Sequence, residues 1–404
     1  MYYNTLNSFK NQYNPNIPLI NLDNQKSVLH HINFKSNFKM NKEFLSKIRS
    51  EYQRENEHQN LLLNNSSESF KLNNESDEDS QDNKSFNYIL IKDKENVRAK
   101  EVIVFFHGLN ERSWLKYLPW ALELHLLTGK AILMFPLAFH INRTPQSWFN
   151  LARLKAISEE RKQNLPGLSN STFANAVLST RIHYQPHKFF QSGMQSYSDV
   201  INIIKQIRSG KHKFIYDDAS IDLFGYSIGA LLAQVLMMSN KNNYFDKSKL
   251  FIFCGGSSLD LTSPVAKAIL DSEASSSLTD FLKKLFSSDS PLTKPLAKLK
   301  DLIEINFLEF LSDYNNNSEL RDKKFDELKD RIFAMALIKD KVFPPDSVIS
   351  TLNGDKMKVP VRTLISDFPY EYTHENPFPA NEKLKEIVDV NFRNVFQFAA
   401  SMVG

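Results

Sequence analysis

The chain has 404 residues, of which 42% are hydrophobic and 12% are aromatic, enough to build a substantial core. Its 50 basic and 46 acidic residues give a net charge of +4, and this near balance argues against a nucleic-acid or anionic-membrane partner. At 404 residues the chain is longer than an average domain. We expect one large core that carries additional segments.

The single cysteine, Cys254, excludes an internal disulfide and favours a reducing compartment. It ends an apolar run, so we interpret it as a small core residue. The first residues contain neither the basic nor the apolar region of a signal peptide, and no apolar run approaches the length of about 18 residues that spans a membrane. We therefore expect a cytoplasmic protein without a membrane span.

Residues 1–85 are expected to form an N-terminal region distinct from the main domain, residues 86–404. The pattern predicts one helix near residues 42–61. Residues 64–85 are polar, acidic and of low complexity, which favours a mobile linker over a docking site for a cation or basic partner.

From residue 86 onward, short apolar runs alternate with helical patterns. This alternation is typical of the α/β class with a mostly parallel central sheet flanked by helices. Strands are predicted at residues 86–91, 102–106, 131–135, 221–224, 250–253, 332–338 and 361–365, and helices at residues 115–127, 194–208, 230–238 and 382–402.

Two segments interrupt the alternation and are predicted to be helical cap insertions: the first cap segment, residues 141–192, and the second, residues 257–328. Apolar residues recur at helical spacing in the second, around residues 278–286 and 296–314, so it either forms a lid over the site or packs on the core. His140 directly precedes the first cap segment, and Arg143 lies near its start. They could contact an acidic substrate group, but a structural ion pair is the preferred interpretation.

The most informative motif is Gly225-Tyr226-Ser227-Ile228-Gly229, which follows a predicted strand and precedes a predicted helix. Glycines two residues before and after a serine let a strand turn abruptly into a helix, which projects the serine hydroxyl at the edge of the sheet. The motif therefore predicts a nucleophile elbow with Ser227 as the nucleophile.

Enzymes that use such an elbow place the acid and then the histidine base after the nucleophile in the chain. Nine of the ten histidines precede Ser227, which leaves His374 as the base. The preferred acid is Asp340, because it follows a buried strand at the end where α/β sheets carry functional side chains. The alternatives that remain open are Asp260, Asp346 and Asp367.

The loop after the predicted strand 102–106 is the candidate second half of an oxyanion hole. We assign the two donors to the backbone amides of Leu109 and Ile228. Gly108 would let the chain pass close to the reacting carbonyl, and His107 is expected to fix the loop by hydrogen bonds.

These motifs, together with the segments Pro136-Leu137-Ala138-Phe139-His140 and residues 369–377, resemble the α/β-hydrolase superfamily over roughly residues 86 to 404. Within it, they look like a bacterial branch without an assigned substrate. The resemblance implies the α/β-hydrolase fold and a Ser227, Asp340, His374 triad, and it implies no particular substrate.

The expected function is that of a serine hydrolase that cleaves a small-molecule carboxylic ester or related acyl compound without a cofactor or metal. The sequence contains no phosphate-binding loop, paired CxxC motif or HExxH motif. The alternatives are an inactive scaffold on the same fold and an acyltransferase that uses the same triad.

Overall fold

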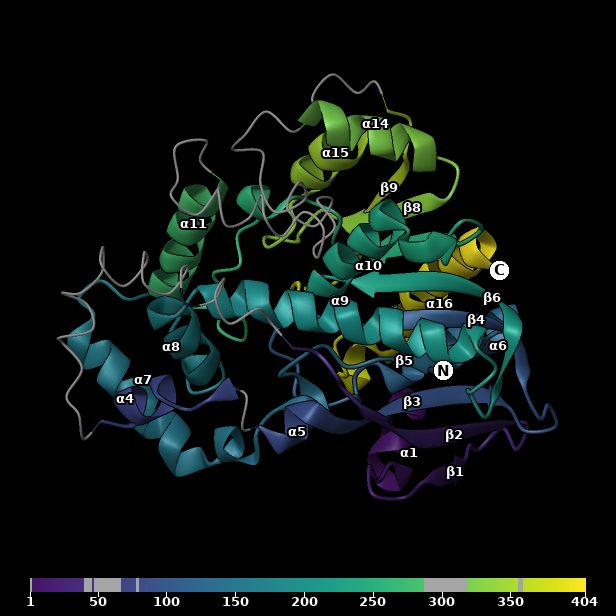
Figure 1. Ribbon diagram of the computed structural model, residues 1–404, viewed down its shortest axis with the longest axis horizontal. Helices are drawn as coiled ribbons and strands as arrows, with labels where there is room; N and C mark the ends of the chain where they lie inside the picture. The colour runs from purple at the N-terminus through teal and green to yellow at the C-terminus, as the bar shows by residue number, and fades with distance from the viewer. Residues whose placement is uncertain (1, 40–45, 47–66, 78–79, 287–317, 355–358) are drawn as a thin grey trace.

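The computed structural model describes residues 2–39, 46, 67–77, 80–286, 318–354 and 359–404. Within these residues the chain forms one mixed sheet with helices on both faces, which confirms the α/β class and the α/β-hydrolase fold (Figure 1). The predicted helix at residues 42–61 and the apolar stripe at residues 296–314 lie outside the described residues, apart from residue 46.

The strands follow the order β1-β2-β3-β5-β4-β6-β7-β8-β9 across the sheet. β1, β2 and β3 pair antiparallel, and every neighbouring pair from β5 to β9 is parallel. Their bounds are β1 (Leu19–Asn21), β2 (Ser27–Lys35), β3 (Ser85–Asp93), β4 (Ala99–Phe106), β5 (Ala131–Met134), β6 (Ile215–Tyr226), β7 (Leu250–Phe253), β8 (Ile332–Leu337) and β9 (Arg362–Ser366).

The helices form two layers and a cap. The bounds are α1 (Tyr2–Gln12), α4 (Glu68–Asn73), α5 (Gln81–Lys84), α6 (Leu118–Thr128), α7 (Leu151–Asn164), α8 (Ala176–Tyr184), α9 (His187–Arg208), α10 (Ile228–Ser239), α11 (Ser272–Phe286), α14 (Ser318–Leu328), α15 (Pro345–Asn353) and α16 (Lys385–Val403). Core residues of α9 and α10 pack on one face of the sheet, and those of α1, α6 and α16 pack on the other. Among the described helices, none is both long and apolar enough to cross a membrane.

The central strands read as unbroken apolar runs because both of their faces are covered. The last five residues of β4 and all four of β7 are buried. Helix α6 has a proline in its first turn and ends at Gly129, whose φ of 72° is the left-handed conformation that commonly stops a helix. These local signals explain why the strands and helices of the main domain lie close to their predicted positions.

The N-terminal region differs from the separate unit that we expected. Strand β2 pairs with β3 over nine residues, from Ser27 opposite Asp93 to Lys35 opposite Ser85. Tyr2, Leu6 and Phe9 of α1 are buried in the same core cluster as α6 and α16. The described part of residues 1–39 therefore extends the central sheet. His30 and His31 in β2 obscure its apolar pattern, and the ring of His30 is sheltered by stacking on Phe214 at 4.2 Å.

The acidic stretch also differs from the mobile linker that we expected, because its charges find partners in the first cap segment. Arg153 pairs with Glu75 at 2.6 Å, and Arg181 pairs with Asp77. Glu160 of α7 accepts hydrogen bonds from the backbone of Glu68 at 2.9 Å, at the start of α4. Ion pairs and a capped helix N-terminus thus order the described part of a segment with few apolar residues.

The described helices of the first cap segment and α11 of the second lie beyond one end of the sheet, the end to which the arrow of β6 points, whereas α14 lies beside α15 (Figure 1). Arg161 of α7 makes a bidentate pair with Asp271 beside α11, with both hydrogen bonds at 2.7 Å and both side chains buried. Helix α9 begins at His187, so its first turns belong to the cap and the rest packs on the sheet. Helices α7, α8 and α11 and the first turn of α9 therefore lie near the edge where the parallel strands end.

Candidate active site

Ser227 lies in a strained turn between β6 and α10. Its φ of 56° and ψ of −126° are rare for a residue with a side chain. A Cβ atom on Gly225 would lie 2.5 Å from the Cα of Ala230, and one on Gly229 would lie 2.6 Å from the carbonyl oxygen of His107. The backbone therefore passes too closely at both positions for any other residue, which is the local reason for the glycine spacing.

Ser227, His374 and Asp340 are linked by hydrogen bonds. The Oγ of Ser227 lies 2.8 Å from Nε2 of His374, and Nδ1 of the same ring lies 2.8 Å from Oδ2 of Asp340. All three residues are buried, with exposed fractions of 3% to 4%. Ser227 follows β6, Asp340 follows β8 and His374 follows β9, so the parallel sheet carries them to one edge although 147 positions separate the serine from the histidine.

The carboxylate of Asp340 is held by the backbone as well as by the imidazole. Its Oδ1 accepts hydrogen bonds from the N–H groups of Val342 and Phe343, both at 2.9 Å. Because Oδ1 receives two donors, Oδ2 is the oxygen that faces His374. The arrangement requires a proton on Nδ1 of His374 and leaves Nε2 free to accept the proton of the Ser227 hydroxyl.

The other three candidate acids lie elsewhere. Asp367 accepts a hydrogen bond from the hydroxyl of Tyr372 at 2.8 Å. Asp346 lies in the first turn of α15, and Asp260 lies in a short 3₁₀ helix after β7. Among the described residues, the structure brings only Asp340 of these four into hydrogen-bond contact with His374.

Two aromatic rings that the sequence argument did not single out enclose His374. The ring of Tyr226 stacks on the imidazole at a centroid distance of 5.4 Å, and its hydroxyl donates to the carbonyl oxygen of His374. Phe343 lies on the imidazole at the same centroid distance. Tyr226 is the residue between the first glycine and the serine of the elbow, so the turn that exposes Ser227 also positions the ring that supports the base.

The ring of His107 makes hydrogen bonds within and across the loop after β4. Its Nε2 accepts the N–H of Leu137 at 3.0 Å, so Nδ1 carries the proton and donates to the carbonyl oxygen of Gly108 at 2.7 Å. Burial, with a smaller contribution from neighbouring charges, lowers the pKa of His107 well below its usual value. His107 is therefore a neutral support of the loop.

A lysine that the sequence gave no reason to notice joins this loop to the loop that carries His374. The Nζ of Lys116 contacts the carboxylate of Glu111 and donates to the carbonyl oxygen of Glu375 at 3.1 Å. Tyr117 donates to Glu111 at 2.6 Å and accepts the N–H of Gly108 at 3.0 Å. The candidate oxyanion loop and the histidine loop are thus tied together.

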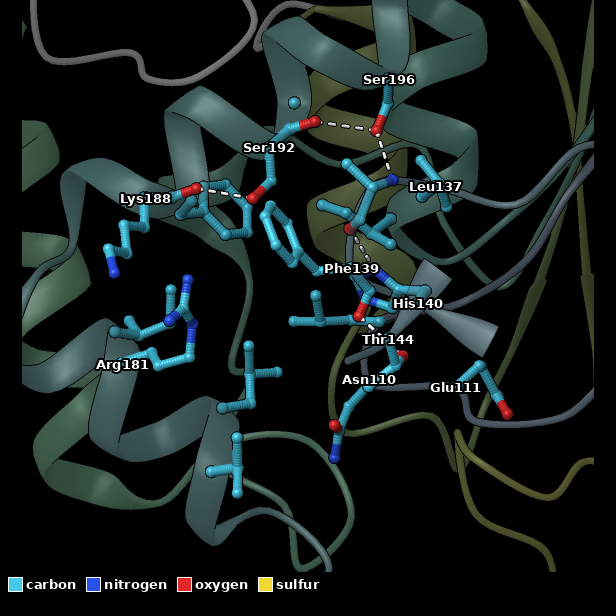
Figure 2. A pocket seen from close by; sticks show the side chains of 18 of the residues that line it. Asn110, Glu111, Leu137, Phe139, His140, Thr144, Arg181, Lys188, Ser192 and Ser196 are labelled. Carbon is cyan, nitrogen blue, oxygen red and sulfur yellow. Dashed lines mark hydrogen bonds between the residues drawn. The ribbon is translucent and has the colours of Figure 1, made fainter. Parts of the chain in front are cut away.

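Two neighbouring pockets share the lining residues Leu109, Phe189 and Ile228, and Ser227 lines one of them. The smaller contains about 530 Å³ of empty space, including its opening, and is lined by Ser227 and by Leu278 and Leu282 of α11. The larger contains about 990 Å³ on the same measure and lies under the first cap segment (Figure 2). Leu109 and Ile228, whose amides are the candidate oxyanion donors, line both.

The structure also shows the contacts of Arg143, His140 and Cys254, which the sequence analysis had singled out. Arg143 is fully buried and pairs with Asp199 at 2.8 Å, as the ion-pair interpretation requires. His140 lines the larger pocket and donates from Nδ1 to the carbonyl oxygen of Ala138 at 2.8 Å. Cys254 is buried at the end of β7, where burial raises the pKa of its thiol well above the usual value.

Comparisons with solved structures return esterases at low sequence identity. Carboxyl esterase 2 from the fungus Tuber melanosporum is 12% identical over 79% of this chain and 81% of its own, with a TM-score of 0.41. A thermostable esterase from Pseudomonas putida is 11% identical over 80% of each chain, with a TM-score of 0.41. The esterase from Pyrobaculum calidifontis is 12% identical over 92% of this chain and 96% of its own, also with a TM-score of 0.41.

No curated protein matches the sequence. A family model does match it from residue 1 to residue 404, and its description is a family of unknown function, DUF6051. The chain therefore belongs to the DUF6051 family.

Proposed function

We propose that this protein is a serine hydrolase that cleaves a carboxylic ester or related acyl compound through an acyl-enzyme intermediate. The observation that carries the proposal is the unbroken hydrogen-bonded chain from Asp340 through His374 to Ser227, with a distance of 2.8 Å at both steps. The strained elbow that presents Ser227 supports it, because such strain is maintained where a side chain must be exposed to a reactant.

In the first step, Oγ of Ser227 attacks the carbonyl carbon of the substrate while Nε2 of His374 takes the hydroxyl proton. Asp340 holds the Nδ1 proton and stabilises the imidazolium that forms. The leaving alcohol then takes the proton from Nε2, and the acyl group remains on Ser227. Water attacks next, gives its proton to His374, and releases the acid as the proton returns to Oγ.

The negative charge on the carbonyl oxygen is assigned to the amides of Leu109 and Ile228. Ile228 is the first residue of α10, so its N–H has no acceptor within the helix and also lies at the positive end of the helix dipole. Leu109 follows Gly108, whose own N–H is already used by Tyr117. The loop that would supply the second donor is therefore held in place independently of substrate.

The walls of the two pockets indicate the substrate class. Both are lined mainly by apolar side chains, and the second cap segment contributes Leu278 and Leu282 to the smaller one. We therefore assign an ester with sizeable apolar groups, and we assign substrate choice to the caps. Cys254 as the sole cysteine supports a reducing, cytoplasmic location.

A fluorophosphonate probe tests the proposal directly, since it reacts with an activated serine. Intact-mass analysis should show one adduct, which peptide mapping assigns to Ser227 in the wild type. Ser227→Ala should take up no probe while unfolding at nearly the wild-type temperature. Ser239→Ala, at the other end of the same helix, is the matched control and should label normally.

Labelling that persists in Ser227→Ala, or no labelling of the folded wild type, would show that the fold serves as a scaffold. If the wild type labels and turns over esters only when an acceptor alcohol or thiol is added, the enzyme is an acyltransferase.

A further inference from the structure

The larger pocket has a cationic end. Arg181 of α8 and Lys188 of α9 both line it, and Figure 2 shows their charged groups facing each other at the end opposite Leu137, His140 and Asn110. Asp77, from the acidic stretch, contacts both cations; its carboxylate lies 3.5 Å from Nζ of Lys188. Burial alone would raise the pKa of Asp77, but the two cations lower it below its usual value, so the residue is a carboxylate.

The guanidinium of Arg181 is buried and makes several contacts, but one of its nitrogens donates no hydrogen bond to the part of the chain that the structure describes. Only 4% of the residue is exposed, and its Nη2 donates to Asp77. The group lies over the rings of Trp148 at 4.5 Å and Phe139 at 5.5 Å, both of which line the same pocket. Its Nη1 is buried and has no hydrogen-bond partner among the described residues.

A buried charged donor without a partner is costly, because it has lost its water and gained nothing in return. The two neighbouring rings and the carboxylate at Nη2 restrain the guanidinium, and Nη1 is the nitrogen that remains for an acceptor. Planar, bidentate or charge-assisted recognition of a carboxylate is the chemistry for which arginine is best suited.

The pocket extends from this donor to the candidate oxyanion residues next to Ser227. Leu109 and Ile228, the candidate oxyanion donors, line the same cavity as Arg181. Between the two ends, the walls are mainly apolar and include Leu178, Ile182 and Leu231. A substrate with its carbonyl at the oxyanion amides could therefore extend an apolar chain along these walls to the guanidinium.

We propose that the preferred substrate carries a carboxylate at the far end of one arm of the ester, and that Arg181 binds this carboxylate through Nη1. The inference rests on the proposed hydrolase function and narrows its substrate class to half-esters of dicarboxylic acids or esters of ω-hydroxy acids. Arg181 is then a specificity-determining residue that takes no part in the chemical step.

Two pairs of esters test the inference. In the first pair, p-nitrophenyl esters carry an acyl chain of eight carbons that ends either in a carboxylate or in a methyl group. In the second pair the acyl group is acetate, and the alcohol has a chain of eight carbons with the same two endings. The wild type should show the higher kcat/KM for the carboxylate member of at least one pair.

Arg181→Gln should remove this preference. A hydrogen bond to a charged group contributes enough for a loss of about 10- to 100-fold in kcat/KM on the carboxylate ester. Turnover of the methyl-ended partner should change less than about threefold, because the apolar walls and the reacting residues remain. The double variant Asp77→Asn with Arg181→Gln removes both buried charges together, so it keeps the test valid if the single variant is unstable.

Arg153→Gln is the matched control. Arg153 also pairs with the acidic stretch, through Glu68 and Glu75, but it does not line the larger pocket. It should leave the carboxylate preference unchanged.

Equal kcat/KM for both members of each pair in the wild type, or equal losses on both in Arg181→Gln, would overturn the inference and leave Nη1 to a bound water. The fluorophosphonate result on Ser227 is independent of the ester pairs. A labelled enzyme without carboxylate preference therefore refutes the carboxylate site alone, and an unlabelled one refutes the hydrolase function itself.

Discussion

Replacement of Asp340 by asparagine tests the hydrogen-bonded chain most sharply, since the substitution keeps the shape and removes the charge. Two backbone N–H groups, of Val342 and Phe343, point at Oδ1 of Asp340. In Asp340→Asn the amide oxygen will accept these two hydrogen bonds, so the amide NH₂ faces Nδ1 of His374. The ring must then accept at Nδ1 and carry its proton on Nε2, which faces Ser227 and can no longer take a proton from it.

The magnitude follows from the alternative orientation. To turn the amide oxygen toward His374, the side chain must place its NH₂ against two N–H donors and lose both hydrogen bonds. At about 1 to 3 kcal/mol for each buried group, this costs about 2 to 6 kcal/mol, or about thirty-fold to a few times 10⁴-fold in the productive tautomer. The imidazolium also loses its carboxylate partner, so we expect turnover to fall about 10⁴-fold.

The assay is kcat/KM on p-nitrophenyl acetate, combined with thermal unfolding to show that Asp340→Asn remains folded. Asp367→Asn is the matched control, because Asp367 also follows a strand and accepts a side-chain hydrogen bond but binds Tyr372. Asp260→Asn and Asp346→Asn should likewise keep most of the activity. A folded Asp340→Asn protein within about tenfold of wild type would refute the tautomer argument, and a crippled control would identify a different acid.

Two further predictions concern the supports of the site and of the fold. Lys116→Met should lower kcat by about 10- to 100-fold with little change in KM, because the oxyanion and histidine loops lose their link. Lys116→Arg should recover part of the loss. Equal changes in kcat and KM, or no change in either, would contradict this positioning role. Burial lowers the pKa of His183 and His212 to about 4, whereas unfolded histidine titrates near pH 6.5, so the unfolded chain binds more protons between these values. Urea unfolding should therefore show stability falling as the pH drops from about 6.5 to 4, by about 1.4 kcal/mol per pH unit for each histidine at the steepest point, and a flat profile would contradict the buried neutral state.

Local pattern was enough to predict the class of the fold. Apolar runs that are buried on both faces, such as those of β4 and β7, are recognisable as parallel strands without knowledge of their neighbours. The elbow is equally local, since the close contacts that require Gly225 and Gly229 are made to the neighbouring helix and strand of the same turn unit. In enzymes with such an elbow the histidine base follows the nucleophile in the chain, and this order left His374 as the only candidate base among ten histidines.

The choice among aspartates was only partly local. Strand position favoured Asp340, but four carboxylates remained open in the sequence, and only the packing of β8 beside β9 brings the loop of Asp340 against that of His374. The chemical roles of Ser227, Asp340 and His374 stay predictions until they are tested in solution.

Tertiary structure alone decided the surroundings of the site and the fate of the N-terminal region. Strand β2 joins the sheet through backbone pairing with β3, 50 to 66 positions away, and nothing in the side-chain pattern of β2 predicts that pairing. The acidic stretch is ordered by arginines that lie about 80 to 100 positions further along the chain. Lys116 and Arg181 are inconspicuous in the sequence because their importance depends on which distant groups they meet. A local pattern records what a residue's neighbours in the chain require, whereas pockets, ion pairs and loop contacts arise between segments that only folding brings together.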